Sequence, residues 1–170
     1  MVVLGFIVTC RVIPHIANFS PMICVALFAG SIFIRRIAVA VVMLGMLLSD
    51  MLLAQIFHYP MVGSWSLFTY SALLAIVALG LRSNIAQQRL TLGIVTVLGS
   101  NLGFWLWTNF GSWLTNYRHT VDGFVTCYIA ALPFLQHSTL SALVWYGLFM
   151  TMARMVNMSL VNRSLSNNQI

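Results

Sequence analysis

The chain has 170 residues, of which 61% are hydrophobic and only 6% are charged. Soluble domains carry about 25% charged residues, so this composition excludes a soluble globular protein and predicts a polytopic membrane protein embedded in a lipid bilayer. The formal net charge of +6 comes from eight arginines, which occur singly or in a pair near the ends of apolar segments. That placement favours a membrane orientation signal and argues against nucleic acid as a partner.

The first two apolar segments, residues 1–13 and 21–34, flank a polar block. The N-terminus has neither a basic region nor a small-residue cleavage site, so we expect a retained helix and not a signal peptide. Within the block, two prolines break the helix, and Arg11, His15 and Asn18 are costly in a bilayer. Irregular backbone at such a position must be buried in protein or line a cavity. The block is therefore a candidate binding site.

Four longer apolar segments follow, at residues 37–57, 66–81, 90–109 and 133–155. A helix needs about 20 residues to cross about 30 Å of hydrocarbon, so these segments are predicted spans. The first two segments are predicted to be short or broken spans of about 20 Å each. Residues 121–132 are predicted to be an interfacial half-helix or the first half of a kinked last span. The expected architecture is an all-α membrane domain of six transmembrane helices over residues 1–156, followed by a short polar cytoplasmic tail at 157–170.

In a six-span arrangement, three groups of arginines fall on one side of the membrane. The groups are Arg35 with Arg36, Arg82 with Arg89, and Arg154 with Arg163. The positive-inside rule makes that side cytoplasmic, which also places both termini in the cytoplasm. The outer face then collects many polar and aromatic groups, namely Arg11, His15, Asn18, His58, Tyr59, Asn109, Trp113, Tyr117, Arg118, His119, Asp122, Gln136 and His137.

Asp50 lies within the third segment, about 20 Å from the inner end of that segment if it is helical. A carboxylate at that depth is costly unless it is paired or protonated. Asp50, Ala54 and His58 are spaced by four and share a helix face, so one interpretation is that this stripe lines an outer cavity. The other interpretation is an internal ion pair between Asp50 and Arg11. Both interpretations hold if the ion pair between Asp50 and Arg11 forms part of the pocket wall.

The fifth segment carries a second row of polar and aromatic residues. Asn101, Trp105 and Asn109 are spaced by four, and Trp113 is next in the same register. The tryptophans fit an interfacial aromatic belt, which needs no ligand. Alternatively, Trp113 forms a wall on which a planar ligand stacks, while Asn109 offers its amide group to that ligand.

The sequence holds no HExxH, no GxSxG, no paired intramembrane aspartates and no Walker lysine, so we expect neither catalysis nor a cofactor. The three cysteines show no CxxC spacing and are expected to be small packing residues. The four histidines share the outer side, and neutral imidazoles suit Zn, Ni or Co. A divalent metal site at His15, His58, His119 and His137 is therefore an alternative, although no pair of them has i, i+4 spacing.

The chain resembles a family of small bacterial membrane proteins of unknown function that are described as transport proteins. The resemblance is carried by Arg11-x-x-Pro14-His15-x-x-Asn18-Phe19-Ser20-Pro21, Ala26 to Gly30, Leu48-Ser49-Asp50, Phe57-His58, Thr108-Asn109-Phe110 with Trp113 and Tyr117, and Gly123 to Phe134. That family is itself similar to the substrate-binding S components of energy-coupling factor (ECF) vitamin transporters. The resemblance implies a six-helix fold in the bacterial inner membrane. It also implies a small molecule bound at the outer face, under a lid formed by the loop after the first helix.

One feature of S components is missing from the first segment. S components present small alanines in an AxxxA pattern on their first helix, and these dock the membrane subunit of a transport-energising module. Residues 1–10 hold no such pattern. An energising module is thus a partner that the resemblance implies, whereas the first segment favours a protein that works alone or with a different partner.

The function that we expect is substrate binding during uptake of a small, vitamin-like or heterocyclic solute. The expected pocket residues are Arg11, His15, Asn18, Asp50, His58, Asn109, Trp113, Tyr117 and Arg118. Two other functions stay open at this point. One is transport of a divalent metal ion past the histidines, and the other is a structural or assembly role in which Arg11 and Asp50 form only an internal ion pair.

Overall fold

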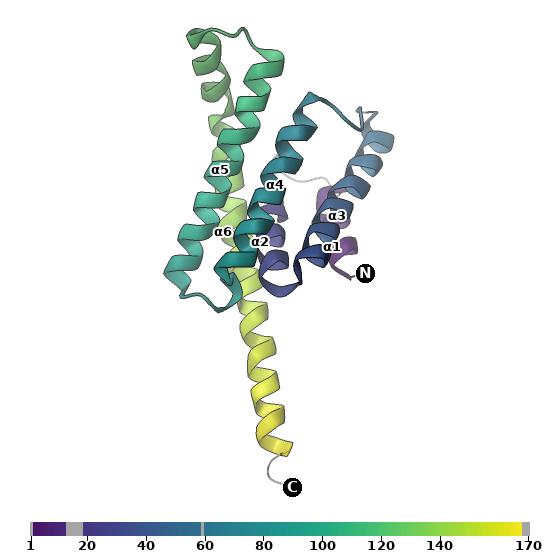
Figure 1. Cartoon of the computed structure of the whole chain (residues 1–170), viewed down its shortest axis with the longest axis vertical. Coiled ribbons are helices and arrows are strands. Elements are labelled where there is room, and N and C mark those ends of the chain that lie inside the picture. Colours follow the sequence, from purple (N-terminus) through teal and green to yellow (C-terminus); the bar gives the residue numbers. More distant parts are fainter. Residues whose placement is uncertain (1, 13–18, 59, 168–170) are drawn as a thin grey trace.

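The structure, a computed structural model, describes residues 2–12, 19–58 and 60–167, with side chains described as far as Val156. Within these ranges the chain is helical and contains no strand. The helices are α1 (Val2–Val12), α2 (Met22–Ile32), α3 (Arg35–Phe57), α4 (Ser64–Ser83), α5 (Leu90–Asn116) and α6 (Val121–Asn167), with a 3-10 turn η1 (Ile85–Gln87) before α5. They form one bundle, and α6 continues beyond the other helices at one end (Figure 1).

Four helices, α3 to α6, are long and apolar enough to cross a membrane. The shortest of them, α4, has 20 residues, which corresponds to about 30 Å and matches the hydrocarbon thickness of a bilayer. Large apolar side chains point outward from these helices; Leu67 and Ile129, for example, are 72% and 60% exposed. An apolar outer surface of this kind suits acyl chains, so the structure indicates a membrane protein, in agreement with the composition.

The first helix, α1, has only 11 residues, about 16 Å, and packs against α3. The fully buried Ile7 lies against Gly45, where a Cβ atom would come within 2.8 Å of Ile7 Cδ1. One turn further along both helices, Arg11 contacts Asp50. The two helices therefore run parallel, and α1 ends beside the sixteenth of the 23 residues of α3. The prediction that the first segment is short is confirmed.

The second helix, α2, is also 11 residues long and forms the centre of the bundle. Nine consecutive residues, Met22 to Gly30, are buried, and α2 contacts α3, α4, α5 and α6. Its closest approach is to α4, at a pair of glycines. A Cβ atom on Gly30 would collide with the carbonyl oxygen of Val77, and a Cβ atom on Gly80 would collide with that of Leu27. The missing side chains allow the two backbones to touch.

The last helix, α6, is continuous through Pro133. The expectation of a separate interfacial half-helix at 121–132 is therefore wrong, and these residues form the first part of the last helix. Proline removes one backbone donor and leaves the carbonyl oxygen four residues earlier, that of Ile129, without its helical partner. Close to this point, Trp105 Nε1 of α5 donates a hydrogen bond of 3.0 Å to the carbonyl oxygen of Ala131. The helical backbone continues through Asn167, into the segment expected to be a polar tail.

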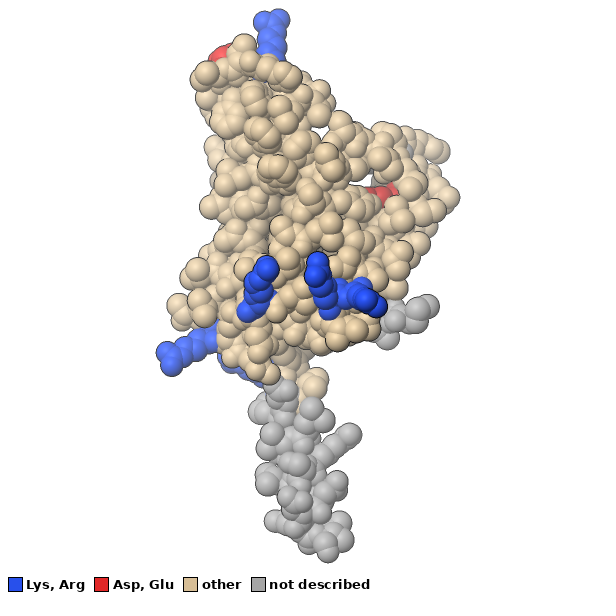
Figure 2. Space-filling model, viewed as in Figure 1, with Lys and Arg blue, Asp and Glu red and all other residues tan. Residues whose placement is uncertain are grey.

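Most of the described arginine side chains lie at one end of the bundle, the end at which α6 continues (Figure 2). The alternating helix directions explain this. Arg35 and Arg36 begin α3, Arg82 is in the last turn of α4, and Arg89 directly precedes α5. The prediction that the first two of the three arginine groups share one side is confirmed, and we call this side the arginine end; the side chain of Arg163 in the third group lies outside the described residues. The α3–α4 and α5–α6 connections lie at the opposite end (Figure 1).

The contact between α2 and α4 can be tested at Gly80. We expect Gly80→Ala to lower the free energy of unfolding by about 1–3 kcal/mol, because the new methyl group forces two backbones apart and overpacks the core. Thermal melting of the detergent-solubilised protein measures the effect. Gly147→Ala is the matched control, since a Cβ atom there meets nothing within 4 Å. Equal melting temperatures for the two variants would contradict the assigned contact.

Candidate functional site

The most strongly bonded polar group within the spans is the ion pair between Arg11 and Asp50. Arg11 lies in the last turn of α1, and its Nη2 donates to Asp50 Oδ1 at 2.7 Å. The two side chains are only 18% and 17% exposed. The other terminal nitrogen of Arg11 contacts the sulfur of Met46. Charge-assisted hydrogen bonds of this length are strong, and either charge alone would be costly at this depth. The predicted internal ion pair is confirmed.

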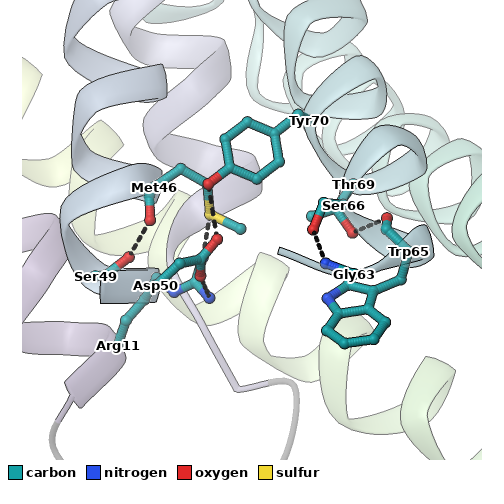
Figure 3. Close-up of polar contacts among 9 residues, drawn as sticks. All are labelled: Arg11, Met46, Ser49, Asp50, Gly63, Trp65, Ser66, Thr69 and Tyr70. Carbon is teal, nitrogen blue, oxygen red and sulfur yellow. Dashed lines mark hydrogen bonds and ion pairs between the residues drawn. The ribbon is translucent and has the colours of Figure 1, made fainter. Parts of the chain in front are cut away.

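Tyr70 of α4 is a third member of this cluster that the sequence analysis missed. Its hydroxyl donates to Asp50 Oδ2 at 2.7 Å, so both carboxylate oxygens accept a hydrogen bond. Figure 3 shows Arg11 and Tyr70 reaching the carboxylate from different helices. A signal was present in the sequence. Asp50 and Tyr70 are each ten residues from position 60, in the turn of the α3–α4 hairpin, and antiparallel helices bring equidistant residues to one depth.

A cavity of about 200 Å³ lies over this cluster. Its polar groups are Arg11 and Asp50, and its other lining residues are Leu53, Ala54, Pro60, Met61 and Trp65. The cavity therefore has a charged floor and mostly apolar walls, formed by the outer turns of α3, the α3–α4 connection and the start of α4. The predicted stripe along α3 reaches this cavity with Asp50 and Ala54.

Trp65 forms one wall of the cavity and depends on Gly63. The indole ring folds back over Gly63, and a Cβ atom at that position would collide with the ring. Gly63 also begins α4, where its N–H donates to Ser66 Oγ at 3.0 Å and its carbonyl oxygen accepts from the N–H of Ser66 at 3.0 Å. Two hydrogen bonds between Gly63 and Ser66 thus fix the start of the helix. Figure 3 shows Trp65 lying across from Asp50, so Gly63 holds the ring beside the polar floor.

Three other predicted residues belong to the same region of the chain. His58 follows α3 in the left-handed conformation, with φ of 55°, and its exposed side chain is not among the residues that line the cavity. His15 and Asn18 lie outside the described residues. Of the three predicted site residues in the polar block, the structure therefore places Arg11 alone, and it places this residue at the cavity.

The predicted residues of α5 form a separate cluster at the α5–α6 connection. Asn109 donates to the carbonyl oxygen of Trp105 at 2.7 Å, within its own helix. Trp113 Nε1 donates to the carbonyl oxygen of Arg118 at 3.1 Å, and the Trp113 ring packs edge-on against Phe124 at 5.4 Å. Tyr117 ends α5. These groups close the turn between two helices, and none of them lines the cavity at Asp50.

The row of polar and aromatic residues further down α5 also serves helix packing. Asn101 is buried and donates to Thr139 Oγ1 of α6 at 3.0 Å. Trp105 donates to α6, and Tyr128 of α6 returns a hydrogen bond of 2.8 Å to the carbonyl oxygen of Leu106. These polar donors find partners on the neighbouring helix, as expected between transmembrane helices. The row therefore joins α5 to α6.

The described residues hold no group of three or more His, Cys, Asp or Glu side chains that could bind a metal ion. His58 follows α3, His119 lies in the α5–α6 turn and His137 lies in α6. The described cysteines are free, and Cys24, the most buried of them, donates to the carbonyl oxygen of Ala142 at 3.3 Å. That contact suits the packing role predicted for the cysteines.

Comparison with protein-family models matches residues 1–164 to the Family of unknown function (DUF6580). The match covers nearly the whole chain, so the chain belongs to this family. The predicted resemblance to a family of unknown function is thereby confirmed, and the further likeness to S components stays a prediction. No curated protein and no solved structure matches the chain.

The energetic role of the cluster can be measured with three variants. We expect Asp50→Asn to lower the free energy of unfolding by about 3 kcal/mol, because it leaves the Arg11 charge largely buried without a counter-charge. Tyr70→Phe should lower it by about 1.5 kcal/mol, the typical contribution of one hydrogen bond to a charged group. The double variant Arg11→Leu with Asp50→Leu should recover most of the loss, because it removes both charges. A double variant less stable than Asp50→Asn in thermal melts would contradict this account.

The support of Trp65 by Gly63 gives a second prediction. In protein labelled with fluorotryptophan, the five tryptophans give five fluorine resonances, and Trp65→Phe identifies one of them. Gly63→Ala should shift mainly that resonance, since the added methyl group displaces the ring. Gly5→Ala serves as the control, because a Cβ atom at Gly5 meets nothing within 4 Å. An unchanged Trp65 resonance in Gly63→Ala would refute the contact.

Proposed function

We propose that this member of the family is a membrane substrate-binding protein that takes up a small heterocyclic or vitamin-like solute. The observation that carries the proposal is the cavity at Asp50, whose floor is charged and whose walls are apolar. Ligand sites in proteins have this character, with mostly apolar walls and a few polar groups that fix orientation, and they often lie between the helices of bundles. Arg11 and Asp50 would hold the polar edge of the solute, and Trp65 would cover one of its faces.

The position of the ion pair supports the proposal. A pair that served packing alone would be best enclosed by side chains on all sides, because water and ligands weaken it. Here an accessible space adjoins both charges, and each side chain keeps nearly a fifth of its surface exposed. Polar groups inside membrane spans commonly mark substrate pathways for this reason. The pair thus has two tasks, joining α1 to α3 and presenting hydrogen-bonding groups to the cavity.

The proposed membrane arrangement has the arginine end in the cytoplasm, by the positive-inside rule. The cavity, near the opposite ends of α3 and α4, would then open toward the outside of the inner membrane, and both termini would be cytoplasmic. We further propose an S-component-like fold of six membrane helices in which α1 and α2 are the two short members. We also keep, from the resemblance to S components, the loop after the first helix as the proposed lid, with His15 and Asn18 as proposed ligand contacts that lie outside the described residues.

A structural or assembly role is the second candidate, and the ion pair itself favours it. Arg11, Asp50 and Tyr70 join three helices, and such a clasp stabilises a bundle without any ligand. The metal-ion alternative stays a prediction, because His15 lies outside the described residues. Substrate binding and the structural role differ in one property, which is whether a small molecule occupies the cavity.

Native mass spectrometry of gently solubilised protein tests for that small molecule. We expect a co-purified solute of low mass in the wild type and its loss in the variant Arg11→Leu with Asp50→Leu, which keeps the apolar packing but lacks the polar floor. A thermal-shift screen with small heterocycles checks the same point. Equal mass spectra for the two proteins, with no stabilising compound, would favour the structural role. Stabilisation by divalent metal alone would revive the metal pathway.

A further inference from the structure

The charge balance around the cavity constrains what can bind there. Arg11 contributes +1 and Asp50 contributes −1, so the floor is neutral overall. Among the described residues, no other charged side chain lines the cavity. The only other acidic residue of the chain, Asp122, lies in the first turn of α6, and the arginines at the arginine end lie at the far end of the spans (Figure 2). The site therefore offers no excess charge of either sign.

A ligand with a net charge would be poorly matched to such a floor. A charged group brought into a poorly solvated site loses hydration, and only a counter-charge can offset that loss. An anion would compete with Asp50 for Arg11 and leave the carboxylate unpaired. A cation would do the reverse and leave Arg11 unpaired. Either outcome breaks a 2.7 Å ion pair that also holds α1 against α3.

A neutral ligand with a donor and an acceptor side by side can bind without breaking the pair. A guanidinium has five N–H donors and a carboxylate has about four lone-pair positions. The contacts among the described residues use one arginine N–H for Asp50, a second for the sulfur of Met46, and one carboxylate lone pair each for Arg11 and Tyr70. The remaining positions can give one hydrogen bond to a carbonyl oxygen and accept another from an N–H. A primary amide or a lactam carries both of these groups side by side.

The size and walls of the cavity limit the rest of the ligand. About 200 Å³ equals the volume of about seven waters at ~30 Å³ each, and it is below the range of about 300–1,000 Å³ found for pockets that hold drug-sized ligands. A single ring therefore fits within the space. Leu53, Ala54, Met61 and Trp65 provide an apolar surface for its faces, as aromatic rings prefer.

From these observations we infer that the solute is uncharged overall and consists of one ring with an amide or lactam edge, which faces Arg11 and Asp50. The inference rests on the proposed function, because it describes the ligand of the same cavity. It excludes simple anions and cations as the cargo. The ion pair forms hydrogen bonds with the polar edge of the ring, and Trp65 packs against its face.

Three probes of one shape test the charge rule. Benzamide is neutral, benzoate is an anion, and benzylammonium is a cation, and each carries a single ring with one short polar group. Binding to wild-type protein is measured by thermal shift and by isothermal titration at about pH 8. We expect benzamide to raise the melting temperature and to bind at least about tenfold more tightly than either ion. Uracil, which carries lactam edges on one ring, should act like benzamide.

Charge variants of the floor provide the second arm of the experiment. Asp50→Asn leaves Arg11 as excess positive charge and should shift the preference to benzoate, while Arg11→Gln leaves Asp50 and should shift it to benzylammonium. The double variant Arg11→Leu with Asp50→Leu should bind none of the three. The wild-type comparison stands by itself if a single variant fails to fold.

The outcomes separate the two proposals. Wild-type protein that binds benzoate or benzylammonium as tightly as benzamide overturns the inference, and loss of that binding in the double variant would still support the proposed function. Wild-type binding that the double variant retains places the probe elsewhere and overturns the inference. If no probe binds and native mass spectrometry finds no solute, both the inference and the proposed function fail.

Discussion

The Arg11–Asp50 ion pair is the interaction on which the placement of α1 depends. In an apolar bundle neither charge is tolerated alone, so α1 has to place its arginine beside the carboxylate of α3. That pairing suits an α1 that runs parallel to α3, and Arg11 lies beside the sixteenth residue of this 23-residue helix. Both charges lie beside a cavity. Tyr70 donates a hydrogen bond to the second carboxylate oxygen of Asp50. Stability and the proposed binding chemistry therefore use the same two side chains.

Much of the fold follows from the sequence because its signals are local and strong. Long apolar runs predict spans, arginines mark one end, and an isolated acid near an isolated base within apolar sequence predicts their pairing. The parts that sequence reasoning missed depend on contacts between distant segments. Nothing in the sequence near Tyr70 marks it as a partner of Asp50, because that contact depends on the register of the α3–α4 hairpin. The role of Gly63 likewise depends on the position of the Trp65 ring above it. Residues before Pro133 fit two predictions, a separate half-helix and the first half of one last span, and the structure shows one helix that passes through Pro133.

The α5 row shows why polar density in a membrane segment is a weak guide to a binding site. Asn109 and Trp113 match the residue types of a ligand pocket, yet their donors bind backbone carbonyl groups within the α5–α6 hairpin. Asp50 differs because it retains accessible surface beside an open space after its hydrogen bonds are counted. The sequence can identify groups that need a partner. Which of them finds that partner inside the protein is decided by the distance to the next helix, and a single sequence does not contain that distance.

The burial of α2 has a consequence for how the protein is made in the cell. At 11 residues, or about 16 Å, α2 is too short to be recognised as a membrane-crossing segment during synthesis. Its buried surface is covered mainly by α4, then by α3, and also by α5 and α6, all of which leave the ribosome after it. We therefore expect α2 to reach its buried position only after these later helices have inserted. The order of final assembly would then differ from the order of synthesis.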